Sequence, residues 1–222
     1  MNTLLKNFGG VRWFPKSVDI YRNNIKLDMS IDDAKVTKSN IVYNLQYLEF
    51  IEKEINDLDL HIVLQKMLYK TYIIIGMGIV ESLFANLLKS KGLWRVSEWR
   101  SIAVLKSNEG KIDDKIIKVN TELFEKIEKF DERMDLDSMI KKIEKKNLLD
   151  INHKVFPALK VLRELRNKVH LQNRNQFEES DFNSFQLEYK KMMGRVLFTI
   201  LTLKEFSNDS NTDIFDFFKC NF

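Results

Sequence analysis

A nine-residue segment, residues 162–170, carries the side chains best suited to chemistry. It reads Leu-Arg-Glu-Leu-Arg-Asn-Lys-Val-His. In an α-helix, with about 100° between successive residues, Leu162, Leu165 and Val169 fall on one apolar stripe together with Ala158. The spacing therefore predicts a helix that buries one side and leaves a polar flank beside the buried seam.

The polar flank combines two arginines, an amide and an imidazole. Arg163 and His170 are seven residues apart, so they lie within about 20° of each other, and Arg166 and Asn167 lie one turn from each on the same flank. A guanidinium can hold a phosphate, and an imidazole can move a proton near neutral pH. The alternative is a solvated helix face that happens to carry one histidine.

Other chemistries lack their motifs in this sequence. There is no glycine-rich phosphate loop, no Gly-x-Ser-x-Gly nucleophile turn, no cysteine cluster and no His-Glu-x-x-His. The three histidines, His61, His153 and His170, are too far apart in sequence to indicate a metal site. We therefore expect no metal and no cofactor.

Arginine, asparagine and histidine together fit the cleavage of RNA. A histidine can take the proton from a ribose 2′-hydroxyl or give one to the leaving oxygen, and arginine stabilises the charge that grows on the phosphate. DNA lacks this hydroxyl, so such an activity would be specific for RNA. One histidine supplies the acid or the base, and two chains facing each other would supply both, which predicts a homodimer.

Composition indicates a helical protein without strong charge imbalance. The 222 residues include only 7 Gly and 2 Pro, which favours long helices over a turn-rich β architecture, and 16 Phe, which suit an aromatic core. The net charge of +4 permits a nucleic-acid partner without requiring one. The single cysteine, Cys220, cannot form an internal disulfide and favours a reducing cytoplasm.

The apolar spacing predicts an all-α fold, a bundle of about five to seven helices. We expect an irregular N-terminal arm over residues 1–30 and a single all-α domain over residues 31–222. The aromatic C-terminal tail is expected to dock on this domain or on a partner. The predicted helices cover residues 31–56, 60–90, 99–105, 112–130, 139–146, 154–172 and 181–206, with loops between them that include residues 107–111.

The most apolar segment, residues 72–88, is interpreted as a core helix and not as a membrane span, so no membrane partner is expected. Gly76 and Gly78 within it would let a neighbouring helix approach closely. Glu81 stands out, because a carboxylate in an apolar helix needs a partner. That partner is either a backbone or tyrosine hydrogen bond or an arginine of the segment 162–170.

A lysine-rich face follows on the helix predicted over residues 139–146. Ile140 and Ile143 are spaced to point inward, and the lysines at 141, 142, 145 and 146 to point outward. This face is interpreted as solvated, with contact to a phosphate backbone as the alternative.

Residues 165–170, Leu-Arg-Asn-Lys-Val-His, resemble the Arg-x(4–6)-His motif of the HEPN superfamily. The segment lies on the penultimate long helix expected here, as it does in that family, and the helix order over residues 35–206 is similar. The resemblance implies a metal-independent endoribonuclease of a toxin–antitoxin, abortive-infection or other bacterial defence system, which typically acts as a homodimer. Other members of the family have lost catalysis and serve as binding or assembly modules.

The match departs from the family in its spacing. Three residues separate Arg166 from His170, fewer than the motif has, whereas six separate Arg163 from His170. Arg163 is the better match by distance and Arg166 by local context, so both are retained. The resemblance implies that His170 acts as acid or base, the arginines hold phosphate, Asn167 orients these groups, and Glu81 on an earlier helix supports them.

Two functions follow from these residues. The first is a cytoplasmic metal-independent endoribonuclease that acts on RNA by 2′-hydroxyl attack. The alternative is a non-catalytic helical interaction or RNA-binding module, such as an antitoxin or an assembly subunit, whose aromatic tail or exposed apolar patch a partner protein covers. A third option is a structural domain in which the Arg/His face only makes ion pairs.

Overall fold

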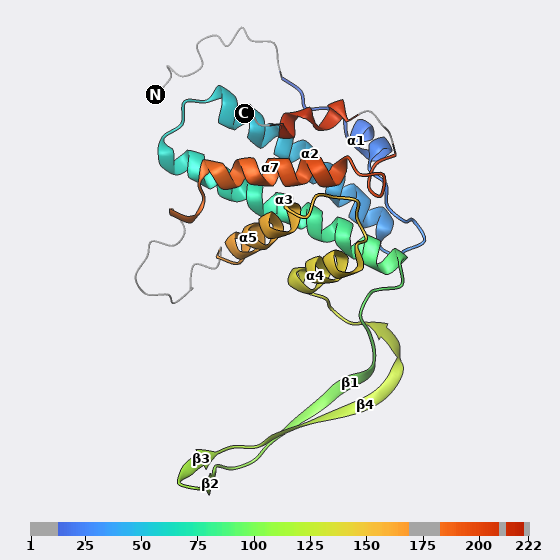
Figure 1. Ribbon diagram of the computed structural model, residues 1–222, viewed down its shortest axis with the longest axis vertical. Coiled ribbons are helices and arrows are strands. Elements are labelled where there is room, and N and C mark those ends of the chain that lie inside the picture. Colours follow the sequence, from blue (N-terminus) through green and yellow to red (C-terminus); the bar gives the residue numbers. More distant parts are fainter. Residues whose placement is uncertain (1–12, 169–182, 209–211, 220–222) are drawn as a thin grey trace, which may run out of the picture.

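The computed structural model describes residues 13–168, 183–208 and 212–219 of the chain. Helices gather into one bundle, and a long β-hairpin projects from it (Figure 1). The helices are α1 (Val18–Asn24), α2 (Ala34–Asp57), α3 (Ile62–Ser90), α4 (Leu136–Lys146), α5 (Val155–Asn167), α7 (Leu187–Leu201) and the 3₁₀ helix η1 (Asp213–Phe218). The strands are β1 (Val96–Lys106), β2 (Gly110–Ile112), β3 (Lys115–Ile117) and β4 (Asn120–Asp131).

Helix α3 is the centre of the bundle. It packs against α2, α4, α5 and α7, and Tyr72, Leu83 and Phe84 are among its fully buried side chains. By length and composition alone α3 could cross a membrane, but 61% of its most apolar window is buried by the rest of the chain. The interpretation of residues 72–88 as a core helix is thus consistent with the structure.

The close contact between α3 and α7 depends on Gly76. A Cβ atom at this position would lie 2.8 Å from Cγ of Met193 and 3.1 Å from a methyl group of Leu197, too close for either to accept it unmoved. The predicted close approach is therefore confirmed at Gly76. Gly78 has open space where its Cβ would be, so the expectation does not hold there.

The two ends of the described chain close the bundle together. Helix α1 lies within the segment expected to be irregular, and its Tyr21 is fully buried beside Phe215 of η1. The Tyr21 hydroxyl donates to Glu49 of α2 at 2.8 Å. Burial, and then the charge of Glu49, raise the pKa of Tyr21 well above its usual value, so this hydroxyl keeps its proton. The aromatic tail thus docks on its own domain through Phe215 and Phe218.

The expectation of an all-α fold is wrong, because the fold is mixed. Residues expected to form helices over 99–105 and 112–130 instead form strands: β1 pairs with β4, and β2 pairs with β3, both antiparallel. The apparent helical spacing at Ile116, Val119, Leu123 and Ile127 competed with a richness in β-branched and aromatic residues that suits strands. Apolar and polar residues do not alternate strictly along these strands. Such alternation arises when one face of a sheet is buried and the other is solvated, and neither face of this hairpin is buried.

Local chemistry explains the hairpin tip and its curvature. Asp113 and Asp114 both have positive φ, at 47° and 59°, and form the two-residue turn between Ile112 and Lys115. Two consecutive residues with positive φ match the twist of antiparallel strands, and aspartate tolerates this conformation. Farther back, register shifts between Ser97 and Trp99 and between Ser101 and Ala103 bend the ribbon.

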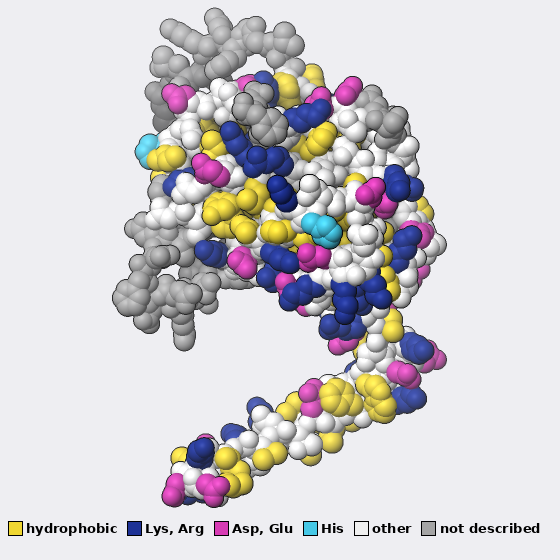
Figure 2. Space-filling view, viewed as in Figure 1, with side chains coloured by type: hydrophobic (Ala, Val, Ile, Leu, Met, Phe, Trp, Pro, Cys, Tyr) yellow, Lys and Arg dark blue, Asp and Glu magenta, His cyan; other side chains and the backbone are white. Residues whose placement is uncertain are grey.

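Among the described residues, the hairpin is joined to the bundle at its root. Lys89 at the end of α3 lies 3.6 Å from Asp131, and Lys142 of α4 donates to the Leu93 carbonyl at 2.8 Å. Beyond this root, among the described elements, β1 and β4 pack closely on one another and not on a helix. Figure 2 shows the hairpin as a separate limb with open space between it and the bundle.

Shortening the hairpin should therefore leave the bundle intact. Replacing residues 98–129 by Asn-Gly would join the paired residues Ser97 and Phe130 through a two-residue turn. We expect the free energy of unfolding to change by less than about 1 kcal/mol, because the described helices do not pack on the part that is removed. The measurement is urea denaturation followed by circular dichroism. A protein concentration of about 0.1 μM keeps the contribution of chain association to the free energy of unfolding small.

The control for this experiment is Leu159→Ala, which opens a cavity at a fully buried position of α5. It should cost about 2–5 kcal/mol. A shortened chain as unstable as this control would show that the hairpin helps to hold the bundle together.

Candidate functional site

Helix α5 carries three of the predicted site residues that the structure describes, and the fourth, Glu81, lies on α3. Leu162 and Leu165 are buried and Ala158 is partly buried, which confirms the predicted apolar stripe over this range. Arg163, Arg166 and the exposed Asn167 lie on α5 itself. The remaining predicted residue, His170, lies outside the described residues, as does Val169.

Arg166 pairs with Glu81 of α3. Its Nη1 lies 2.6 Å from Oε2 of Glu81, and each side chain is about one third exposed, at 32% and 31%. Of the two kinds of partner that the sequence left open for Glu81, the structure has an arginine of this segment. The carboxylate thus fixes the last turn of α5 against the central helix.

Arg163 is held by a different helix. Its Nη2 lies 3.3 Å from Oδ1 of Asp137 on α4 and 3.9 Å from Glu164 of α5. Its Nε is buried and makes no hydrogen bond within the described part of the chain. Arg163 and Arg166 therefore have separate acidic partners on two neighbouring helices.

Basic side chains on the described part of the α5 flank lie against carboxylates of neighbouring helices. One turn earlier, Lys160 lies 2.9 Å from Glu144 of α4, so three basic side chains on this flank each have a carboxylate partner. A phosphate would have to compete with these carboxylates for the guanidinium groups. The described part of this flank joins α5 to α3 and α4, and carboxylates already engage both of its arginines.

A groove beside Glu81 contains an arginine that the sequence analysis did not single out. The groove has a volume of about 320 Å³ and is lined by Glu81, Lys89, Trp94 and Arg133, among others. Lys89 is already engaged, because it lies 3.1 Å from Asp33 and 5.4 Å from the Trp94 ring centroid. Arg133 is exposed and has no ion pair among the residues that the structure describes.

The hairpin carries the largest set of exposed apolar side chains, which sequence reasoning missed. Trp99 is 52% exposed, Leu105 57%, Phe124 52% and Ile116 74%. Figure 2 shows these hydrophobic side chains along the whole limb. The exposed large apolar residues of the hairpin are Val96, Trp99, Ile102, Val104, Leu105, Ile112, Ile116, Val119, Leu123, Phe124 and Phe130.

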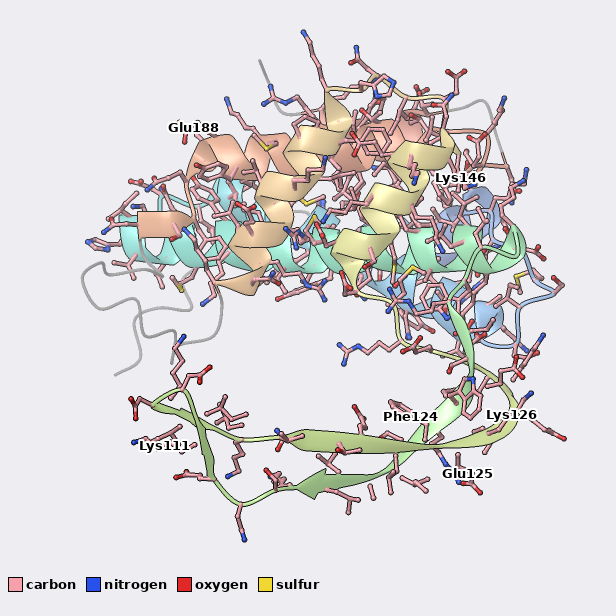
Figure 3. The ribbon with its side chains drawn as sticks, turned by 60° about the horizontal axis from the view of Figure 1, so that its bottom comes forward. Lys111, Phe124, Glu125, Lys126, Lys146 and Glu188 are labelled. Carbon is pink, nitrogen blue, oxygen red and sulfur yellow. The ribbon has the colours of Figure 1, made fainter. Side chains whose placement is uncertain are left out.

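Both faces of the hairpin are apolar. Neighbouring side chains on a strand point to opposite faces, so the adjacent residues Leu123 and Phe124 of β4 lie on different sides of the ribbon. Figure 3 shows Phe124 and Glu125 on opposite sides in the same way. Leu123 pairs with Ala103, and Phe124 with Ser101, so each face continues onto β1.

The charges of the hairpin nearly balance, and some of them form ion pairs across the strands. Residues 96–131 hold seven lysines and arginines and eight aspartates and glutamates. Arg100 lies 3.1 Å from Glu125 across the strands, and Lys126 lies 3.3 Å from Glu98. A limb that tracks a phosphate backbone would instead carry excess positive charge.

A sequence signal for the hairpin existed. Residues 96–106 and 116–130 are rich in Val, Ile, Trp and Phe, and the turn-forming segments Asn108-Glu109-Gly110 and Asp113-Asp114 lie between them. What the sequence did not signal is that both faces stay uncovered, because this depends on where the root directs the ribbon.

Comparison with family models, with curated proteins and with solved structures gave no significant match.

The Arg166–Glu81 pair should contribute measurably to stability. In a double-mutant cycle with Arg166→Ala and Glu81→Ala, we expect a coupling energy of about 1 kcal/mol, since the pair is partly buried and joins two helices. Urea denaturation of the four chains gives this energy.

The matched control is the pair Arg22–Asp19 on α1, which has the same 2.6 Å separation but an aspartate that is 78% exposed. Its coupling energy should be no more than about 0.5 kcal/mol. Equal coupling energies for the two pairs would contradict a structural role for Glu81.

Proposed function

We propose that this chain is a protein-interaction module, a helical bundle that presents a two-stranded hairpin to another protein chain. The observation that supports this is the exposure of apolar side chains on both faces of β1 and β4. A lone hairpin is marginally stable in water, and exposed apolar patches of this extent mark interaction sites. The proposal corresponds to the non-catalytic alternative of the sequence analysis.

The chemistry of the hairpin favours a protein partner over a nucleic acid or a membrane. Its near-zero net charge gives no attraction to phosphate. Its charged side chains occur along its whole length, and burying them in lipid would be costly. A protein surface can cover the apolar side chains and still leave the paired charges at a solvated rim.

Photo-crosslinking in cells tests this proposal. A photoreactive phenylalanine analogue in place of Phe124 should form a covalent adduct with a protein, since this side chain would lie inside the interface. The same analogue at Glu188, at the exposed start of α7 on the bundle, is the control and should form little adduct. Adduct formation is read by electrophoresis and mass spectrometry.

The interaction proposal would be contradicted if the analogue at Phe124 formed no protein adduct, or formed no more adduct than the Glu188 control. An adduct with RNA in place of protein would contradict it as well.

A metal-independent ribonuclease of HEPN type is the second candidate, and one observation favours it. Glu81 holds Arg166 in the last turn of α5, only four positions before His170 in the sequence. This pair supports the role that the resemblance implies for Glu81. The carboxylate partners of both arginines weigh in the other direction, because they occupy the groups that would hold phosphate.

RNA cleavage separates the two candidates. The interaction proposal predicts that purified chain, with a chelator present, leaves single-stranded RNA uncut. Cleavage that is abolished by His170→Ala, but retained in the control His153→Ala at an exposed histidine, would overturn this prediction and establish the ribonuclease. Single-stranded DNA of the same sequence controls for contaminating nucleases, since 2′-hydroxyl attack requires RNA.

A further inference from the structure

We propose that the hairpin's partner is a second copy of this chain, and that two chains interlock by their hairpins. This inference rests on the proposed function and names its partner. In the assembly, each hairpin enters the opening between the hairpin and the bundle of the other copy. One apolar face then lies against the partner's hairpin and the other against the partner's bundle.

The shape of the chain suits this arrangement. The hairpin does not extend straight outward from its root; it bends and runs beneath the bundle, as Figures 1 and 3 show from two directions. The register shifts near Ser97 and Ser101 supply the bend. The result is a hook, and two identical hooks can engage each other around a twofold axis, in which each surface of one copy meets its equivalent in the other.

The area of the hairpin is close to what a stable dimer requires. Strands of 11 and 12 residues make a ribbon about 36 Å long, at roughly 3.3 Å per residue and about 10 Å across. Each face then offers about 360 Å², and both faces together about 700 Å². A standard interface buries about 800 Å² per partner, so one face alone is too small and two faces nearly suffice.

A partner that covers both faces has to surround the hairpin, and the chain itself provides such a surface. A flat partner would cover one face and leave either Phe124 or Leu123 in water. The opening beside the hairpin of a second copy has walls on two sides, the hairpin and the bundle. The opening in a second copy therefore has one wall for each face of the ribbon.

Charge is compatible with the same arrangement. The hairpin, residues 96–131, has a net charge of −1. The whole chain has a net charge of +4, so the residues outside the hairpin sum to +5. A hairpin against the bundle of another copy would bring opposite net charges together. The cross-strand pairs Arg100–Glu125 and Glu98–Lys126 are already formed within each hairpin, so docking leaves these charges partnered.

Sedimentation equilibrium of the purified full chain tests the dimer. We expect twice the 26.4 kDa mass of one chain at micromolar concentration. Phe124→Glu and Leu105→Glu, substitutions at more than half-exposed positions of the hairpin, should each weaken dimerisation about tenfold or more. The matched control is Tyr43→Glu on α2, an aromatic side chain that is 55% exposed on the bundle, and it should leave the dimer unchanged.

Each outcome decides the matter. A wild-type chain that stays monomeric at about 100 μM would overturn the dimer. If Phe124 then crosslinks to a protein whose mass differs from that of this chain, the interaction proposal stands with another partner. A dimer unaffected by both hairpin substitutions, or weakened equally by Tyr43→Glu, would also overturn the interlocked arrangement. Circular dichroism of each variant establishes that the bundle remains folded.

Discussion

A two-stranded hairpin has no interior, so each apolar side chain on β1 and β4 depends on another surface for its cover. The bundle does not provide that surface, because the described helices pack on one another and leave the hairpin outside. Burial of apolar area is the main favourable term in association as well as in folding. Exposed residues such as Trp99 and Phe124 are therefore best understood as an interface that the single chain leaves incomplete.

The bundle supplies the rigidity that such an interface requires. Its central helix α3 is packed by four others, and it carries the hairpin's root at its C-terminal end. Lys89 connects this end to α2 through Asp33 and to the hairpin through Asp131. The ion pairs of α5 have a related structural effect, because Arg163 and Arg166 connect this helix to α4 and α3. The two arginines that suggested phosphate chemistry thus also hold α5 in place against α4 and α3.

The sequence predicted most of the helical part of the fold and little of the interface. The helices over residues 31–56, 60–90, 139–146 and 154–172 correspond to α2, α3, α4 and the described part of α5, because strong 3.6-residue periodicity records a buried face. The sequence indicated that Glu81 needs a partner but left open a hydrogen bond or an arginine, and the structure has Arg166. The hairpin was not predicted, because neither of its faces is buried in the single chain and the usual alternation is absent. The conformation of the segment that holds His170 lies outside the described residues.

Hydrogen–deuterium exchange of the backbone amides tests the central claim most directly, namely that the hairpin is covered in an assembly. Amides of β1 and β4 should exchange more slowly as protein concentration rises from about 0.1 to 100 μM, whereas the amides of α3 should not change. Fast exchange along β1 and β4 that is independent of concentration, in a chain with no bound protein partner, would contradict the account.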